Sequence, residues 1–213
     1  MGSPGAGKGT LAARLKALRV EHFSSGDYFR REIERRTPLG RSIEGAMERG
    51  ELVSDEMTLQ LLRQWFWGRP ASRGFLLDGF PRTLVQAVNF DEWLDVRQET
   101  LTGCLLLELP EEATVERLTG RRVCPRDGRL YHLKSHPPAN PGVCDDCGSE
   151  LVRREDDEES VVRHRHELYL ESSRPLIEHY RNQGLLWRFS AEGDPAEVAR
   201  RVLDRFDLNF IES

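Results

Sequence analysis

Short apolar runs alternate along the chain with longer stretches in which apolar residues recur at helical spacing. The short runs occupy residues 22–24, 75–77, 104–109 and 185–189, and their length predicts buried strands. Among the longer stretches, one helix face carries Thr58, Leu61, Leu62, Trp65 and Phe66, and another carries Ala87, Phe90 and Leu94. Because strands that alternate with helices form parallel sheets, the pattern predicts an α/β fold, a doubly wound parallel sheet with helices on both faces.

Two segments break this alternation. Residues 25–69 predict about three short helices with a stop at Pro38-Leu39-Gly40, and residues 121–157 are rich in turn residues and cysteine. Such excursions from a sheet are where mobile lids are usually found. The acidic residues 155–159 predict the solvated start of a helix. We expect a core domain formed by residues 1–24, 70–120 and 158–213, a helical insertion at 25–69, and a lid at 121–157.

Composition narrows the class of protein. The chain has 213 residues, of which 31% are charged and 38% hydrophobic, which is typical of one soluble domain with insertions. Its apolar runs are far shorter than the roughly 18 residues of a membrane span, so we expect no membrane partner and a cytoplasmic location. The net charge of −5 argues against a nucleic-acid partner.

The sequence GSPGAGKGT at residues 2–10 is typical of a phosphate-binding loop. Glycines let the backbone curl until several N–H groups point at phosphate oxygens, and Lys8 adds a positive charge. A helix that begins near Gly9 directs its positive end at the same anion. The loop therefore predicts a site for a nucleoside triphosphate.

Such a loop normally follows a buried strand, and here only Met1 precedes it. We expect this first strand to be missing from the core, which leaves its two neighbours unpaired. Each unmade buried hydrogen bond costs about 1–3 kcal/mol against a total stability of about 5–15 kcal/mol. We therefore expect the natural start to lie several residues upstream.

The sequence FLLDGFPR at residues 75–82 predicts a short buried strand that ends in an acid. In a phosphate-loop protein, Asp78 at such a strand end can act on Mg²⁺ directly or through water. Gly79 and Pro81 force a turn that presents Arg82, whose guanidinium matches a phosphate group. The alternative is a surface turn with a solvated arginine, and the glycine loop upstream favours the phosphate site.

Two cysteine-containing turns lie in the expected lid. Ligand-type residues stand three apart in each turn, Cys124 with Asp127 and Cys144 with Cys147, and a glycine follows each pair. Zinc accepts thiolates and a carboxylate in a tetrahedral site, so this spacing predicts structural zinc. The alternatives are His132 as the fourth ligand and a metal-free lid held by hydrogen bonds.

Taken together, the motifs resemble those of the adenylate kinase family, among the nucleoside monophosphate kinases, and of its zinc-lid type. The matching segments are 2–10, 24–30, 51–56, 74–83, Gln86, 120–132 and 153–165, in the order of the family. The resemblance implies reversible transfer between Mg-ATP and AMP that gives two ADP, with ATP, AMP and ADP as the partners of a monomer.

The resemblance also implies roles for single residues. The ATP phosphates would be held by Gly5, Gly7, Lys8, Gly9 and Thr10. Asp78 would act on Mg²⁺ through water, and Arg117 would pack on the ATP base. The residues expected at AMP are Ser25, Arg30, Arg82 and Gln86. Val53, Gly79 and Tyr131 are expected at a nucleotide. The moving phosphoryl group would be surrounded by Arg121, Arg154 and Arg165, and the acidic pair near the lid hinge would be Asp156 and Asp157.

Elementary chemistry agrees with this resemblance. A phosphoryl group in transfer needs convergent positive charge and the exclusion of water, and it needs no protein nucleophile. The open alternatives are a kinase for another monophosphate and a non-catalytic nucleotide- or zinc-binding module left by N-terminal truncation. The joint presence of Lys8, Asp78, Arg82 and Arg121 favours an enzyme.

Overall fold

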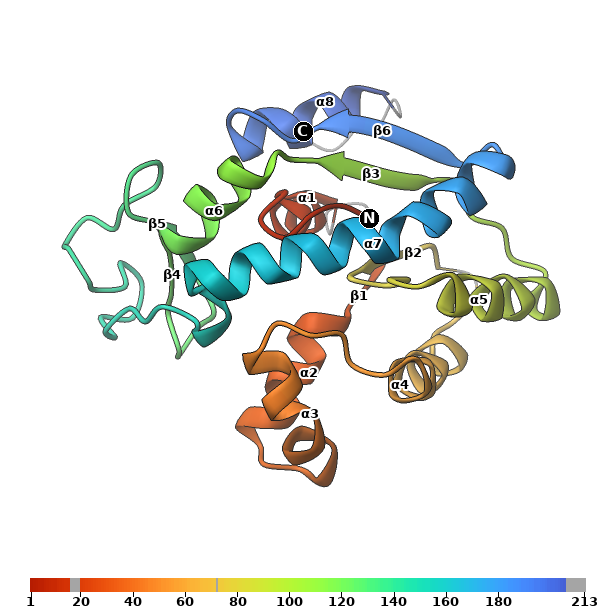
Figure 1. Cartoon of the computed structure of the whole chain (residues 1–213), viewed down its shortest axis with the longest axis horizontal. Helices are drawn as coiled ribbons and strands as arrows, with labels where there is room; N and C mark the ends of the chain where they lie inside the picture. The colour runs from red at the N-terminus through yellow and green to blue at the C-terminus, as the bar shows by residue number, and fades with distance from the viewer. Residues whose placement is uncertain (16–19, 72, 206–213) are drawn as a thin grey trace.

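The computed structural model describes residues 1–15, 20–71 and 73–205 (Figure 1). Residues 16–19, 72 and 206–213 fall in the expected core segments and lie outside the described residues. The elements are α1 (Lys8–Leu15), β1 (Glu21–Ser24), α2 (Ser25–Glu34), α3 (Pro38–Glu48), α4 (Asp55–Gly68), β2 (Phe75–Asp78), α5 (Leu84–Arg97), β3 (Cys104–Glu108), α6 (Glu111–Thr119), β4 (Arg121–Val123), β5 (Leu130–His132), the 3₁₀ helix η2 (Glu155–Asp157), α7 (Glu159–Asn182), β6 (Leu186–Ser190) and α8 (Pro195–Arg205).

All the strands predicted from the apolar runs are confirmed, and they pair in parallel. β1 pairs with β2, with Phe23 opposite Leu77, and β3 pairs with β6, with Leu106 opposite Arg188. Within the described residues these are two separate pairs and not one continuous sheet. The parallel arrangement brings the carboxyl ends of β1 and β2 to one edge, where Ser24 lies opposite Asp78.

The first two residues occupy the free edge of β3. The amino group of Met1 donates to the carbonyl oxygen of Leu105 at 2.5 Å, and the amide of Leu107 donates to the carbonyl of Met1 at 3.1 Å. Gly2 forms a parallel bridge with Leu107. The backbone therefore enters the glycine loop directly from the edge of the β3–β6 pair.

Helices cover both faces of the β3–β6 pair, as predicted for an α/β fold (Figure 1). On one face, Leu107 packs with residues of α1 and α8, including Leu11 and Val202. On the other face, Cys104 and its neighbours pack against a cluster of α5 and α7 residues. Alternate residues of β3 face opposite sides, as the two-residue period of a strand requires.

The segment 25–69 folds as the three predicted helices, α2, α3 and α4. The predicted stop at Pro38 is wrong, because Pro38 begins α3: Thr37 caps this helix by accepting a hydrogen bond from the amide of Gly40. Proline is tolerated in a first helical turn, where its missing N–H has no partner. The predicted apolar face of α4 is confirmed, and an aromatic cluster that includes Phe23, Phe66 and Phe90 packs it against β1 and α5.

The segment 121–157 begins with the antiparallel strands β4 and β5, in which Arg122 lies opposite Tyr131. A bridge between Val123 and Val152 closes the base of the segment. In Figure 1 it projects from the ends of α6 and α7, away from the parallel strands. Among the described helices, none combines the length and the apolar character that a bilayer span requires.

Candidate active site

The glycine loop wraps around the side chain of Lys8. Gly5 and Gly7 have φ angles of 72° and 84°, a region that favours glycine because other residues meet a steric penalty there. The Lys8 Nζ donates to the carbonyl oxygens of Gly2 and Ser3, each at 2.8 Å. Of the remaining predicted loop residues, Gly9 is exposed and Thr10 is half-buried, both in the first turn of α1.

The turn after β2 places Arg82 beside the AMP candidate Ser25. The carbonyl oxygen of Gly79 accepts hydrogen bonds from Ser25 Oγ at 2.8 Å and from Arg82 Nε at 2.9 Å. Asp78 at the end of β2 is close enough to raise the pKa of Lys8. The strand end thus presents a carboxylate, a hydroxyl and a guanidinium on one edge of the fold.

Gln86 is buried, with 2% of its surface exposed, and both ends of its amide are engaged. Its Oε1 accepts from the amide of Arg82 at 2.8 Å, and its Nε2 donates to Asp55 Oδ1 at 2.7 Å. Thr83 donates to the same oxygen of Asp55 at 2.9 Å. Gln86 therefore ties the Arg82 turn to the first residue of α4.

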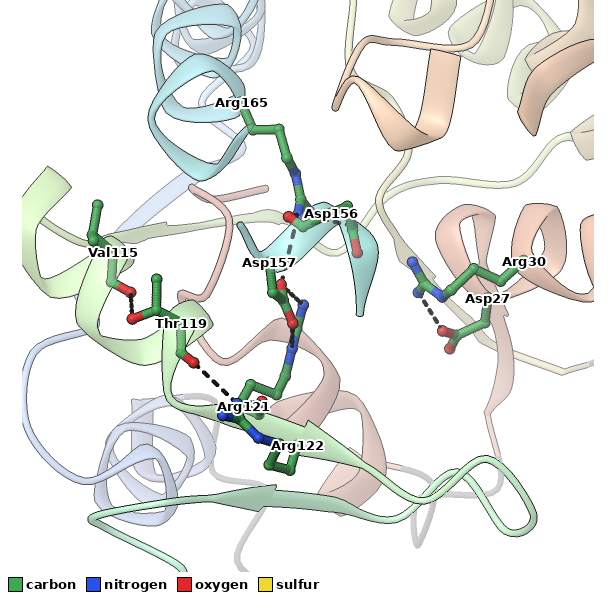
Figure 2. A network of polar contacts seen from close by, with 9 residues as sticks. All are labelled: Asp27, Arg30, Val115, Thr119, Arg121, Arg122, Asp156, Asp157 and Arg165. Carbon is green, nitrogen blue, oxygen red and sulfur yellow. Dashed lines mark hydrogen bonds and ion pairs between the residues drawn. The ribbon is translucent and has the colours of Figure 1, made fainter. Parts of the chain in front are cut away.

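The acidic pair at η2 holds two of the predicted arginines (Figure 2). Asp157 is fully buried and accepts from Arg121 Nε at 2.8 Å and from Arg121 Nη2 at 2.5 Å. Asp156 pairs with Arg165 Nη1 at 2.8 Å, and its carbonyl oxygen accepts from the same nitrogen at 2.7 Å. The expectation that this acidic run is solvated is wrong for Asp157, because two arginine hydrogen bonds compensate for its burial.

Arg30 also has an acidic partner, on its own helix. Its Nη2 contacts Asp27 Oδ1 at 2.6 Å, one turn away on α2 (Figure 2). Burial raises the pKa of Asp27, but the hydrogen bond and charge of Arg30 outweigh it, with smaller contributions from Ser24 and Arg154, so that the pKa is lowered. Because the charge of Arg154 lowers the pKa of Asp27 on α2, the segment before η2 lies within electrostatic reach of the insertion.

The predicted cations converge on one region. Desolvation by burial, with smaller contributions from the charges of Arg82, Arg165 and Arg121, lowers the pKa of Lys8 to about 8 against the opposing effect of Asp78. Desolvation by burial, with like charges nearby, also lowers the pKa of Arg82 and of Arg154 to about 10. Mutual repulsion among cations held this close predicts a strongly favourable site for an anion.

Arg117 contacts the glycine loop through its guanidinium. Its guanidinium donates to the carbonyl oxygens of Gly5 at 3.3 Å and of Ala191 and Gly193, both at 2.7 Å. Burial lowers its pKa, against the charges of Asp194 and Glu192. It joins the phosphate loop to the loop after β6, a role that its motif does not reveal.

Two further nucleotide candidates pack into apolar surroundings. Val53 is half-buried against the aromatic cluster of α4. Tyr131 is 2% exposed inside the lid, where its ring packs with Cys124 and Cys144. Its hydroxyl donates to Cys144 Sγ at 3.5 Å and accepts from the amide of Asp145 at 2.9 Å. The structure therefore places Tyr131 at the cysteine cluster, so a contact with nucleotide stays a prediction.

The four predicted metal ligands do meet in the lid. One ligand atom from each of Cys124, Asp127, Cys144 and Cys147 lies within 4.8 Å of the other three. The two sulfurs of Cys124 and Cys147 are 3.3 Å apart, and Cys144 Sγ lies 3.2 Å from Asp127 Oδ2. Ligand atoms around a tetrahedral zinc ion are about 3.3–3.8 Å apart, so the donor set fits zinc.

Neighbouring groups affect the four ligand side chains in different directions. The amide of Arg129 donates to Asp127 at 2.8 Å and, with the nearby thiols, keeps the pKa of that carboxyl low. Hydrogen bonding with Ser149 lowers the pKa of Cys147, whereas burial raises that of Cys124 to about 11. The alternative ligand His132 is occupied elsewhere, since its Nδ1 accepts from the amides of Lys134 and Ser135.

Two further acids that hold predicted site residues are not predicted by the sequence analysis. Asp27 and Asp55 stand inside the quoted motifs 24–30 and 51–56, but only their neighbours were assigned roles. The signal that could have found Asp27 is its spacing of three residues from Arg30, which brings both onto one helix face. No local signal links Asp55 to Gln86, because the contact joins two different helices.

A glycine loop that opens a helix, an acid at the end of β2 and a cluster of cations define the class of phosphate-loop nucleotide kinases. The comparisons with known proteins agree. The family model described as "Adenylate kinase" matches residues 1–185. The adenylate kinase of Thermotoga petrophila is 46% identical over 190 residues, covering 88% of this chain and 86% of the relative.

Other relatives lead to the same family. The adenylate kinase of Moorella thermoacetica is 48% identical over 187 residues, or 87% of this chain and 86% of the relative. That of Pseudothermotoga lettingae is 42% identical over 203 residues, or 95% and 94%. The chain therefore belongs to the adenylate kinase family, and it is a phosphotransferase of the kinase type.

Proposed function

We propose that the chain catalyses reversible, Mg²⁺-dependent transfer of the γ-phosphoryl group from ATP to AMP, giving two ADP. The observation that carries this proposal is that Arg82, Arg121 and Arg165, and Asp78 at the end of β2, all lie within electrostatic reach of Lys8. Fixed cations aimed at one volume stabilise the charge that spreads over a phosphoryl group in transfer. The attacking atom belongs to the second substrate, so the protein supplies charge and position.

The roles divide between the two nucleotides. The loop amides and Lys8 bind the phosphates of ATP, and Arg117, which donates to the carbonyl oxygen of Gly5, packs on the base. Arg30 and Arg82 bind the phosphate of AMP, beside the Ser25 hydroxyl. The residues placed around the phosphoryl group are Arg121, Arg154 and Arg165, with Asp156 and Asp157 orienting two of them.

Gln86 and Val53 are the proposed selectivity elements for AMP. An amide can form two hydrogen bonds with the edge of an adenine base, and a guanine presents the opposite donor and acceptor pattern. The contacts of Gln86 with Asp55 and Arg82 fix the plane of its amide. We also propose that residues 25–69 and 121–157 close over the bound nucleotides, which protects ATP from hydrolysis.

Two metal ions complete the proposal. Asp78 is half-buried at the strand end beside Lys8, and a carboxylate there suits Mg²⁺ held through water. Magnesium would supply charge neutralisation between the phosphates. Cys124, Asp127, Cys144 and Cys147 would hold a structural zinc ion, because the protein itself fills all the tetrahedral positions. We expect the enzyme to act as a monomer in the cytoplasm.

The test is ADP formation by the purified chain from Mg-ATP with AMP, GMP, CMP and UMP in parallel reactions. The proposal expects rapid ADP formation with AMP and at least tenfold lower kcat/KM with the other three. Preference for a different monophosphate would reassign the substrate. Nucleotide binding without turnover would instead support the non-catalytic module.

A further inference from the structure

Gly50 lies between α3 and α4, where the chain leaves the helix in a left-handed conformation with φ of 74°. Its amide donates to the carbonyl of Met47 at 3.1 Å, and the next amide donates to Ala46 at 2.9 Å. A glycine is common at this position of a helix end. Terminating the helix requires only this backbone conformation, and it does not require another side chain to fill the space beside the α-carbon of Gly50.

The space beside Gly50 is filled by α7. A β-carbon built on Gly50 would lie 2.4 Å from Cγ and 2.8 Å from Cδ of Arg165, and 2.9 Å from Cγ1 of Val161. Carbon atoms that are not bonded do not approach this closely, because attraction turns to repulsion well outside 3 Å. The aliphatic stem of Arg165 therefore occupies the volume that a side chain at position 50 would need.

The other end of Arg165 is held by the lid hinge. Its Nη1 lies 2.8 Å from the carboxylate of Asp156 and donates to the carbonyl of the same residue at 2.7 Å. The side chains of Arg165 and Asp156 are 20% and 15% exposed. Arg165 thus reaches from the surface of the 25–69 insertion to η2. Its aliphatic stem packs against Gly50, and its guanidinium is held by Asp156.

We propose that Gly50 is a positioning residue, whose bare α-carbon seats the stem of Arg165 and so links the insertion to the guanidinium beside the phosphoryl group. The inference rests on the proposed function. When the insertion sits against α7, the stem is confined, and the guanidinium lies within electrostatic reach of Lys8 and Arg82. A side chain at position 50 would displace the stem and move the head out of this arrangement.

The test compares Gly50→Ala with Gly184→Ala. Gly184 has φ of 71° but no atom within 4 Å of a built β-carbon, so it carries the same backbone strain without the contact. We expect Gly50→Ala to lose more Tm than Gly184→Ala, because the clash with Arg165 adds to the backbone strain, and we expect kcat to fall at least tenfold in Gly50→Ala alone. KM for ATP should change less than threefold, because the loop and Lys8 are untouched.

A double-mutant cycle identifies the contact responsible. Arg165→Ala removes the stem, so adding Gly50→Ala in that background should lower kcat by less than twofold. Val161→Ala relieves only the 2.9 Å approach and should not rescue Gly50→Ala. If Gly50→Ala fails to fold, Gly50→Ala with Arg165→Ala should recover most of the Tm of Arg165→Ala.

Equal kcat in Gly50→Ala and Gly184→Ala would overturn the proposal, as would the same loss from Gly50→Ala with and without Arg165. Failure of the double variant to fold when Arg165→Ala folds would also overturn it. Wild-type turnover is measured in parallel. An inactive wild-type chain would contradict the proposed function. The double-mutant cycle of Tm values for Gly50→Ala and Arg165→Ala would still test the packing of the Arg165 side chain against Gly50.

Discussion

The buried carboxylate of Asp157 holds the guanidinium of Arg121 through two hydrogen bonds, of 2.8 and 2.5 Å. Arg121 begins β4 at the base of the lid, and Asp157 ends η2 just before α7. The pair therefore links the two backbone segments that connect the lid to the rest of the fold. It also fixes the orientation of a cation that the proposed reaction requires.

Asp157→Asn tests this pair. The substitution preserves size but leaves the Arg121 charge partly buried without a counter-ion, a loss that typically costs about 3–5 kcal/mol in free energy of unfolding. We expect kcat to fall roughly 10–100-fold, since a misoriented cation stabilises the transition state less. Urea unfolding and steady-state kinetics measure both effects.

The control for this variant is Asp204→Asn. Asp204 pairs with Arg200 at 3.0 Å on the exposed side of α8, and exposed pairs contribute only about 0–1 kcal/mol. This control should retain full activity and nearly full stability. Equal behaviour of the two variants would mean that the Asp157 pair has no special role.

The pH dependence of ATP use should report the charge of Lys8. Its pKa is lowered to about 8 in the folded protein, so above that pH the free enzyme loses the cation that binds phosphate. We expect kcat/KM for ATP to fall above about pH 8, whereas kcat/KM for AMP at saturating ATP stays flatter, because bound phosphate keeps Lys8 protonated. A profile for ATP that is flat to about pH 9.5 would contradict this assignment.

The same group affects stability with a defined sign. Between pH 8 and its ordinary pKa of 10.5, Lys8 holds a proton in the unfolded chain that it has lost in the folded one. Because the unfolded state binds more protons in this window, the contribution of Lys8 makes the free energy of unfolding rise with pH there. Subtracting the pH dependence of Lys8→Met from that of the wild type isolates this contribution.

Metal removal should affect stability more than chemistry. We expect one zinc ion per chain by elemental analysis, and a fall in Tm of several degrees on chelation or in Cys144→Ser, with a smaller change of activity at 25 °C. Cys104→Ser is the control, because Cys104 lies in β3 outside the cluster and should leave the zinc content unchanged. Equal Tm with and without a chelator would remove the case for structural zinc.

Gln86 donates a hydrogen bond to Asp55 at 2.7 Å. This contact predicts that a substitution at Asp55 can compensate for the stability lost when position 86 becomes charged. Gln86→Glu places two carboxylates in contact in a partly buried site, so we expect lower Tm and weaker AMP binding. Adding Asp55→Asn restores a donor opposite the new carboxylate and should recover most of the lost Tm. Selectivity for AMP should not recover, because Glu lacks the amide N–H, and recovery of both properties would show that Gln86 does not select the base.

Sequence reasoning worked best where local pattern and chemistry coincide. The parallel strands follow from apolar runs such as 75–77, and the glycine loop follows from a motif whose spacing is set by phosphate geometry. The cluster of Cys124, Asp127, Cys144 and Cys147 was predictable because each pair of ligands lies in one turn. In these cases the residues that interact are close along the chain.

The remaining features depend on distant segments. The burial of Asp157 depends on Arg121, which lies across the whole lid in the sequence, and the space beside Gly50 depends on α7. The motif around Tyr131 predicts a contact with nucleotide, whereas packing with Cys124 and Cys144 determines the position of its side chain within the lid. Composition and spacing do not determine such tertiary neighbours, although they indicate which residue types are available.

The most direct test of the account follows the labelled γ-phosphoryl group of ATP in the presence of AMP, Mg²⁺ and the purified chain. The account predicts that the label appears in the β-position of ADP, at a rate that falls at least 100-fold in Arg82→Ala, with little label in inorganic phosphate. Label released mainly as inorganic phosphate, or retained in ATP by a well-folded chain, would contradict phosphoryl transfer between nucleotides as its function.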